Sequence, residues 1–215
     1  MRKWIPLIII LATMVFAAVV YDRLPERMPV HWNARGEVDR YGSRLWSAFG
    51  LPVFLLLIWG LLRAIPYIDP RRANIEKFRR TYEDLIVVVI ASTSLIQVAT
   101  IGAALGWPVS VGRVVPVAVG LHFMFLGNIL PRFRSNWFIG IRTPWTLSSD
   151  TVWTKTHRFG GRLMLAVGAL LVAAGLIGSA MWLTVAVAGA VGMAIGVILY
   201  SYIVWRTERG EAEVP

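Results

Sequence analysis

The chain of 215 residues contains no cysteine. Disulfide bonds, thiol catalysis and metal sites with cysteine ligands are therefore excluded together, and the redox compartment stays undetermined. Charged residues are also scarce, at 16% of the chain, whereas apolar residues make up 57% and the mean hydropathy is +0.63. A soluble domain needs charged surface all round, so this composition indicates a membrane protein.

Acidic residues are the scarcer of the charged types, with 12 Asp and Glu against 22 Lys and Arg, which gives a formal net charge of +10. The basic residues lie between hydrophobic runs and form no basic domain of their own. We therefore expect them to face anionic lipid headgroups of the bilayer, and we expect no direct binding to nucleic acid.

Six apolar segments come close to the roughly 20 residues that a helix needs to cross a hydrocarbon core of about 30 Å. The first follows Met-Arg-Lys, as a signal peptide would, but its apolar run is long and no Ala-x-Ala site follows, so we retain it as a helix. The sequence predicts an all-α integral membrane protein with six transmembrane helices. They are expected at about 4–21, 46–65, 85–106, 113–130, 162–178 and 181–204.

The positions of Lys and Arg predict the orientation, because cytoplasmic loops carry the excess of positive charge. With six spans, 16 of the 22 Lys and Arg residues fall on the side that holds the two termini. Both termini are therefore expected to be cytoplasmic. The loop 21–45 is then external, and the segments 66–84 and 131–161 are internal.

Two regions are expected along the chain. Residues 1–65 form an N-terminal module of two helices joined by an ordered external loop, and residues 66–215 form a four-helix region with the cytoplasmic hairpin 131–161. At the start of the second region, NIEKFRRTYED (74–84) places acidic and basic residues at helical spacing. This pattern predicts that the segment extends the third span as a solvated stalk.

Small residues spaced four apart allow helices to pack closely in lipid. Gly102 with Gly106, and Gly192 with Gly196, fit this pattern. They predict helix contacts, either within the chain or between chains, so the oligomeric state stays open.

Polar side chains in the third and fourth spans are expected to face the bundle interior, because an unpaired polar group in hydrocarbon costs several kcal/mol. Gln97, His122 and, near the end of its helix, Asn128 stand out. His122 fits a neutral imidazole bonded to a neighbouring helix, or a proton or ligand site. A proton relay needs a carboxylate at similar depth, and none of the six spans contains one near its middle.

The external loop contains the stretch LPERMPVHWNARGEVDRYGSRLW, in which two prolines favour extended backbone and Gly36 supplies a turn. His31, Asn33 and Asp39 are expected to lie around this turn, with Gly36 as part of the same site. These residues fit a compact structural cap or the recognition of a peptide or lipid. They match a divalent metal site poorly, because a single histidine stands among scattered acids.

The internal segment NWFIGIRTPWTLSSDTVWTKTHRFGGR (136–162) combines aromatic residues and cations with an Arg-Thr-Pro-Trp-Thr turn. Ser148 or Ser149 is expected to cap a helix that starts near Asp150. Four aromatic residues, Trp137, Phe138, Trp145 and Trp153, suit an interfacial depth, and the cations suit phosphate headgroups. The segment fits a lipid anchor or a docking site. Its candidate contact residues are Asn128, Arg132, Asn136, Arg142, Pro144, Trp145, Thr146, Asp150, Trp153, His157 and Arg158.

No catalytic constellation is evident in the sequence, since one would need a nucleophile with a base, or paired carboxylates. Asp150 and His157 are seven residues apart, about two helical turns. His31 and His157 are expected on opposite faces of the membrane. We therefore expect no enzyme activity, no cofactor and no bound metal.

Two motifs resemble those of a known family. Pro29-Val-His31-Trp-Asn33-Ala-Arg-Gly36-Glu-Val-Asp39 resembles the Pro-x-His-x-Asn-x-x-Gly-x-x-Asp signature of a small membrane module of uncharacterised function that begins proteins of the SdpI family. Gly127-Asn128, followed by Asn136-Trp-Phe-Ile-Gly-Ile-Arg142-Thr-Pro144-Trp145-Thr146 and Asp150-x-x-Trp153-x-x-Thr-His157-Arg158-x-Gly-Gly, resembles the long SdpI-family motif almost position by position.

The SdpI family comprises bacterial immunity and signalling membrane proteins. The resemblance implies a multi-pass protein of the bacterial cytoplasmic membrane that protects against a membrane-active toxin peptide and, when occupied, recruits a winged-helix transcriptional autorepressor. The external loop would meet the toxin, and the segment around Arg142–Arg158 would meet the repressor. The alternatives are a small transporter or exporter, with Gln97, His122 and Asn128 along its path, and a membrane-embedded enzyme acting on lipid or peptide.

Overall fold

The computed structural model describes residues 2–33 and 35–212. Six of its helices are long and apolar enough to cross a membrane, which confirms the predicted all-α fold with six spans. They are α1 (Ile5–Val20), α2 (Arg44–Ile68), α4 (Arg79–Ala104), α5 (Val111–Ile129), α7 (Asp150–Ile177) and α8 (Ala180–Ala212). Short 3-10 helices extend α1 on both sides (η1, Arg2–Trp4, and η2, Tyr21–Arg23) and follow α5 (η3, Leu130–Arg132).

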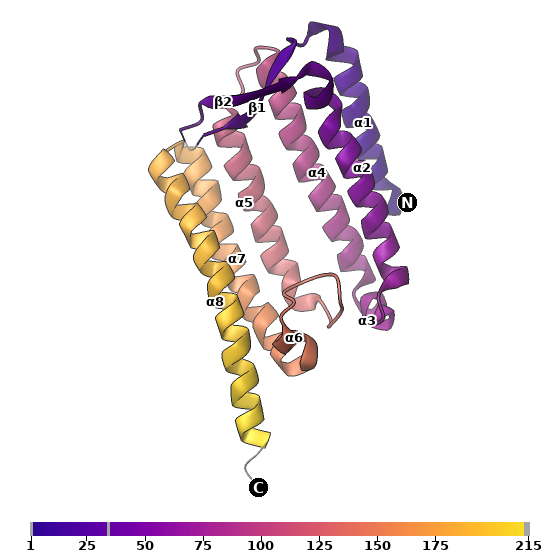
Figure 1. The fold of residues 1–215 in the computed structure, drawn as a ribbon, viewed down its shortest axis with the longest axis vertical. Helices are drawn as coiled ribbons and strands as arrows, with labels where there is room; N and C mark the ends of the chain where they lie inside the picture. Colours follow the sequence, from indigo (N-terminus) through magenta and orange to yellow (C-terminus); the bar gives the residue numbers. More distant parts are fainter. Residues whose placement is uncertain (1, 34, 213–215) are drawn as a thin grey trace.

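Two short helices and a β-hairpin lie at opposite ends of the bundle (Figure 1). The helices α3 (Arg72–Lys77) and α6 (Pro144–Ser148) stand at one end, and the strands β1 (Arg27–Trp32) and β2 (Val38–Ser43) pair antiparallel at the other. The sequence predicted extended backbone and a turn here but no sheet, because strands rich in Arg, Pro and Asp lack the usual β-branched pattern. Gly36 lies in that turn with φ +78°, a conformation that glycine adopts without strain.

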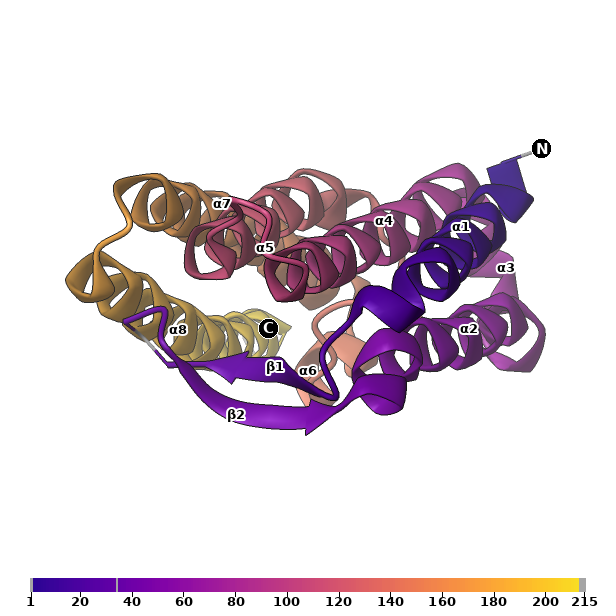
Figure 2. The same cartoon turned by 90° about the horizontal axis from the view of Figure 1, so that it is seen from above.

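Viewed from the hairpin end, the helices α1, α4, α5 and α7 form one row (Figure 2). The helices α2 and α8 stand in front of the two ends of this row, and the hairpin crosses the space between them. The sequence order of the helices therefore does not match their spatial order, since α2 and α8 come from the two ends of the chain but flank the same space.

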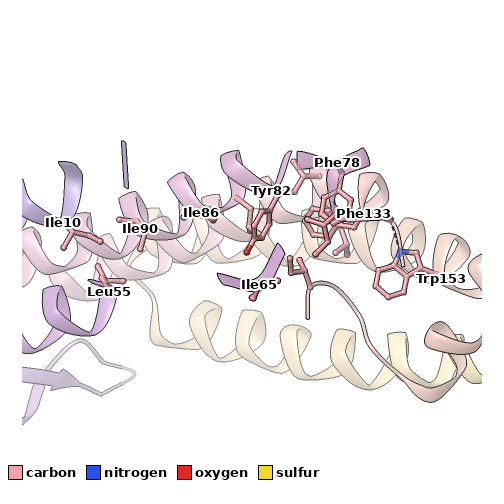
Figure 3. Close-up of a cluster of buried hydrophobic side chains, with 14 residues drawn as sticks. Ile10, Leu55, Ile65, Phe78, Tyr82, Ile86, Ile90, Phe133 and Trp153 are labelled. Atoms are coloured by element: carbon pink, nitrogen blue, oxygen red, sulfur yellow. Dashed lines mark hydrogen bonds between the residues drawn. The ribbon is translucent and has the colours of Figure 1, made fainter. Parts of the chain in front are cut away.

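The main apolar core joins α1, α2 and α4 to the turn after α5 and to α7 (Figure 3). Ile10, Leu55 and Ile90 lie in one part of it, and Phe133 and Trp153 in another. Trp153 is buried, and its indole N–H donates to the Phe133 carbonyl at 2.9 Å. Trp153 therefore faces the protein interior and not the lipid headgroups, because its polar N–H is satisfied inside the protein.

Helices α5 and α7 approach closely through glycines spaced seven residues apart. Gly120 and Gly127 on α5 face Gly168 and Gly161 on α7, and seven residues further along Gly175 of α7 faces the backbone of Arg113 and Val117. A Cβ atom at Gly127 would lie 2.5 Å from the Gly161 carbonyl oxygen, and one at Gly168 would lie 2.6 Å from the Gly120 oxygen. Close backbone approach of this kind provides the van der Waals packing that holds helices together in lipid.

The glycine pairs that the four-residue spacing predicted make no helix contact of this kind. A Cβ at Gly102 would meet the Trp107 ring, and Gly106 lies past the end of α4 with φ +81°. A Cβ at Gly192 or Gly196 would meet no atom of the described chain within 4 Å. Within one chain, the prediction from small-residue spacing is therefore wrong.

The predicted stalk at residues 74–84 is broken into two helices, α3 and α4. Phe78 lies between them because its side chain turns into the core, where its ring centroid lies 5.1 Å from that of Phe133. Helical spacing predicts three ion pairs, Glu76 with Arg80, Arg79 with Glu83 and Arg80 with Asp84, of which the described residues show Arg79 with Glu83 at 3.8 Å. The segment is thus packed against the bundle on one side rather than solvated all round.

Candidate functional site

The turn of the β1–β2 hairpin is organised by Asn33. Its Oδ1 accepts hydrogen bonds from the backbone N–H groups of Arg35 at 2.9 Å and of Glu37 at 3.1 Å. Its Nδ2 donates to the Glu37 carboxylate at 2.8 Å. This bond, aided by Arg35, holds the pKa of the Glu37 carboxyl below its usual value, because both favour the charged form. Asn33 therefore fixes the loop shape through both the oxygen and the nitrogen of its side-chain amide.

His31 and Asp39 lie on the two strands of the hairpin, with Nδ1 and Oδ1 2.5 Å apart. Both side chains are about half exposed, so they are open to a ligand that approaches from solvent. The structure thus brings His31, Asn33, Gly36 and Asp39 together in one hairpin. In the described residues, no three His, Asp or Glu side chains gather where they could hold a metal ion.

A cavity of about 540 Å³ lies beneath the hairpin. Strand β1 forms its roof, and its walls come from α2, α4, α5, α7 and α8. The volume and the mainly apolar lining of this cavity match those of ligand pockets, which usually measure about 300–1,000 Å³. The apolar wall residues include Leu51, Ile96, Val115, Leu171 and Leu183.

A few polar groups line this cavity among the apolar walls. Gln97 is buried, and its Nε2 donates to the backbone carbonyls of Ser47 at 2.8 Å and Ala48 at 3.1 Å. Both amide hydrogens are then used, and no donor in the described chain reaches the Oε1 atom. The buried Ser47 hydroxyl also lacks a partner there, and Thr100 adds a second hydroxyl to the lining. Such groups can hydrogen-bond a peptide backbone in an apolar setting.

The three polar residues expected inside the membrane occupy different places. Gln97 lines the cavity, whereas neither His122 nor Asn128 does. His122 Nδ1 lies 3.0 Å from the Ser92 hydroxyl, which links α5 to α4. Asn128 is exposed, so the expectation that it faces the bundle interior is wrong. The structure does not bring these residues into one transport path.

At the opposite end, the segment between α5 and α7 is built on a fully buried asparagine. Asn136 Oδ1 accepts from the N–H groups of Phe138 at 3.0 Å and Ile139 at 2.7 Å. Its Nδ2 donates to the carbonyls of Arg134 at 2.9 Å and Ile139 at 3.0 Å. With all four bonding positions used inside its own loop, the side chain sets the loop conformation.

His157 is also fully buried, and its ring bonds to the backbone on both sides. Nε2 accepts from the Ile141 N–H at 3.0 Å, and Nδ1 donates to the Trp153 carbonyl at 2.8 Å. The ring stacks on Trp153 with centroids 4.0 Å apart. Since one nitrogen accepts while the other donates, the imidazole is neutral. Gly140, with φ +107°, permits the close approach of the loop to this ring.

The segment between α5 and α7 is also bonded to α8. Thr143 and Thr146 form a capping box at the start of α6, and the Thr143 hydroxyl lies 3.1 Å from that of Ser201. Ser149 caps α7, one of the two predicted positions, and donates to Glu208 at 2.7 Å. These contacts tie the segment between α5 and α7 to the last helix, α8.

Two residues that the sequence interpretation missed, Asp69 and Arg71, join the turn after α2 to the same segment. The buried Asp69 accepts from the Trp137 N–H at 2.9 Å and from the Arg71 N–H at 2.6 Å. The Arg71 guanidinium donates to the Ser135 hydroxyl and to the Leu147 carbonyl. The available signal was a carboxylate directly after a span, followed within three residues by two arginines.

Four of the predicted contact residues are therefore corrected to structural roles. Asn136, Thr146, Trp153 and His157 are buried, so they hold the segment together and present no surface to a partner. Trp145 is half-buried and packs on Tyr202. The remaining predicted residues are exposed, namely Asn128, Arg132, Arg142, Pro144, Asp150 and Arg158.

Residues 132–201 match the family model described as SdpI/YfhL protein family, and residues 8–56 match one described as Domain of unknown function (DUF1648). The chain is 25% identical over 170 residues to Immunity protein SdpI of Bacillus subtilis (strain 168), which covers 79% of each chain. No solved structure matches the chain. With the six spans, these matches confirm the resemblance to the SdpI family and a multi-pass bacterial membrane protein.

Proposed function

We propose that this chain, whose residues 132–201 match the SdpI/YfhL family model, is an immunity protein that protects a bacterial membrane by binding a membrane-active toxin peptide beneath the β1–β2 hairpin. The single observation that carries this proposal is the cavity of about 540 Å³, which is roofed by the hairpin and walled by five helices. The relative of this chain in Bacillus subtilis is itself an immunity protein by name.

The cavity chemistry suits a peptide of this class. A toxin that acts in a membrane carries apolar side chains, which the apolar walls accommodate. Its backbone N–H groups need acceptors once they leave water, and the free Oε1 of Gln97 supplies one. The Ser47 and Thr100 hydroxyls supply two more bonding groups. A peptide held here is removed from the population that damages the bilayer.

The proposed orientation places this site outside the cell. The side with both termini carries 16 of the 22 Lys and Arg residues, and cytoplasmic loops hold this excess. The hairpin lies at the opposite end of the bundle from α3 and α6 (Figure 1). Labelling of a cysteine introduced at Tyr41, in β2, by a membrane-impermeant thiol reagent tests this: labelling in intact cells is expected, and labelling only after lysis contradicts it.

The test of the function is survival of Bacillus subtilis cells that lack their own SdpI immunity protein and are exposed to the toxin that then kills them. Expression of this chain is expected to restore growth. Thr100→Trp, which fills the cavity, is expected to abolish the protection, whereas Leu95→Trp, on the exposed face of the same helix, is expected to retain it. Equal protection by both variants would contradict binding of the toxin in the cavity. No protection by the wild type would contradict the proposal that this toxin is its target.

We infer as a second function that the occupied protein recruits a winged-helix transcriptional repressor to the inner membrane face. Two helices connect the cavity to the internal segment. Leu171 of α7 and Leu183 of α8 line the cavity, while the other ends of these helices carry His157 and Ser201, which bond the segment. A ligand that shifts α8 against α7 would move the exposed arginines, so occupied and empty states would differ in affinity for the repressor.

Recruitment is tested by co-purification of the candidate repressor with the detergent-solubilised protein, with and without toxin. Arg142 is exposed and donates to the Trp137 carbonyl at 2.8 Å. Arg142→Ala is expected to reduce recruitment and leave membrane insertion intact. Arg80→Ala removes an exposed arginine from α4 and is expected to change nothing. Recruitment that is equal in both variants would count against docking on this segment.

A further inference from the structure

A second cavity, of about 350 Å³, lies at the end of the bundle opposite the hairpin. Three helices each direct one arginine toward it: Arg63 from α2, Arg72 from α3 and Arg79 from α4. Two carboxylates, Glu76 and Glu83, share the lining. Neither the immunity function nor the internal segment between α5 and α7 uses this cavity.

The two carboxylates are already paired with one of the arginines. Arg79 lies 3.1 Å from Glu76 and 3.8 Å from Glu83. The side chains of Arg63 and Arg72, in contrast, make no hydrogen bond or ion pair with any residue that the structure describes. Arg63 is also half-buried. Three arginines and two carboxylates leave the lining with a net charge of +1. A partly desolvated guanidinium with no acceptor is costly, so this excess positive charge favours an anion.

The geometry of this cavity is fixed by the break between α3 and α4 and by a proline in α2. Pro66 has no N–H to donate to the carbonyl of Leu62, four residues earlier. The buried Tyr82 hydroxyl donates to that carbonyl instead, which ties α4 to α2 beside the three arginines. The two free cations are therefore held on a rigid frame rather than on mobile loops.

The cavity borders a surface suited to lipid. On α2, Leu61 is 54% exposed and Tyr67, which lines the cavity, is 74% exposed. An apolar residue followed by an exposed tyrosine at the end of a span is typical of the membrane interface. Acyl chains can lie along the exposed apolar face of α2 while a headgroup enters the cavity.

We propose that this cavity binds the phosphate group of an anionic phospholipid of the inner leaflet, with Arg63 and Arg72 as its donors. Guanidinium groups present paired N–H donors that match phosphate oxygens, and the bond is charge-assisted. Basic pockets between helices at the cytoplasmic face are suited to such headgroups. A soluble phosphate offers the same chemistry but would not use the apolar face of α2.

The proposal is tested by native mass spectrometry of the full-length protein in detergent, titrated with phosphatidylglycerol, with phosphatidylcholine or with inorganic phosphate. We expect saturable binding of phosphatidylglycerol, with a half-saturating concentration at least tenfold lower than for phosphatidylcholine. Arg63→Gln with Arg72→Gln is expected to raise that concentration about tenfold, since each lost charge-assisted bond weakens binding. Arg80→Gln with Arg158→Gln removes the same charge from exposed positions elsewhere and is expected to leave it unchanged.

Equal binding of phosphatidylglycerol by all three proteins would overturn the site. Equally tight binding of inorganic phosphate to the wild type, lost in the Arg63 and Arg72 variant, would overturn the lipid as the ligand. If the double variant does not fold, the exposed Arg72→Gln is measured alone, and an unchanged half-saturating concentration would overturn its role.

Discussion

The contact between α5 and α7 gives a prediction whose magnitude follows from the structure. A Cβ atom at Gly127 would lie 2.5 Å from the Gly161 carbonyl oxygen and 2.9 Å from the Leu165 nitrogen. Both of these atoms belong to the backbone of α7, so no side chain can move aside. Gly127→Ala therefore requires the two helices to separate.

The size of the effect follows from that separation. An ordinary contact begins at 3.4 Å, so the shortfall is about 0.9 Å. A gap of about 0.5–1 Å forfeits a quarter to a half of the dispersion energy of each contact that it opens. Overpacking of this kind typically costs about 1–3 kcal/mol. Alanine is a better helix former by about 1 kcal/mol, which offsets part of this loss.

A matched control isolates the packing cost. At Gly192 in α8, a Cβ would meet no atom of the described chain within 4 Å, so Gly192→Ala gains the helix propensity without a clash. We expect Gly127→Ala to be less stable than Gly192→Ala by about 1–3 kcal/mol in reversible unfolding in mixed micelles. Equal stability of the two variants would refute the close α5–α7 contact.

Three further predictions concern buried and surface hydrogen bonds. His157→Phe keeps the stack on Trp153 but leaves the Ile141 N–H without an acceptor, and it should lower the free energy of unfolding by about 1–3 kcal/mol, measured in the same micelles; an unchanged value would contradict the bond. Tyr82→Phe leaves the Leu62 carbonyl unpaired. The free energy of unfolding should fall by about 1–2 kcal/mol, and hydrogen exchange around the C-terminal turn of α2 should become faster. Unaltered exchange would count against the Tyr82 hydrogen bond. The lowered pKa of Glu37 means that the ionised Glu37 carboxylate stabilises the hairpin at pH values above the usual carboxyl pKa of 4.5, and that this stabilisation is lost as the pH falls through the lowered pKa. Amide hydrogen exchange in the hairpin should become faster over that pH range. Asn33→Ala should remove this pH dependence.

The transmembrane pattern could be predicted because lipid leaves the backbone few choices. A span must form its hydrogen bonds within one helix, so length and apolar content alone locate it. The helix cap at Ser149 and the turn at Gly36 could also be predicted, because both are local features of the chain. Each depends on a side chain or a φ angle within a few residues, which the sequence displays directly.

The misinterpretations share a different cause. Gly161 and Gly168 pack against α5, whereas a Cβ at Gly192 would meet no atom of the described residues within 4 Å, yet all three are glycines in apolar helices. Likewise Asn136 and Arg142 stand in one polar segment, but only the asparagine is buried. Which face of a helix or loop turns inward depends on its neighbours, so composition and spacing could not distinguish these residues.

The sequence by itself determined that the chain crosses the membrane with six helices, because that depends on the transfer of each segment from water into lipid. Only the tertiary structure decided where the two cavities lie. The first is walled by five helices from distant parts of the chain, and the second forms where the consecutive helices α2, α3 and α4 fold back on one another. The free acceptor of the one and the free arginines of the other become recognisable only when the hydrogen bonds and ion pairs of their neighbours are known.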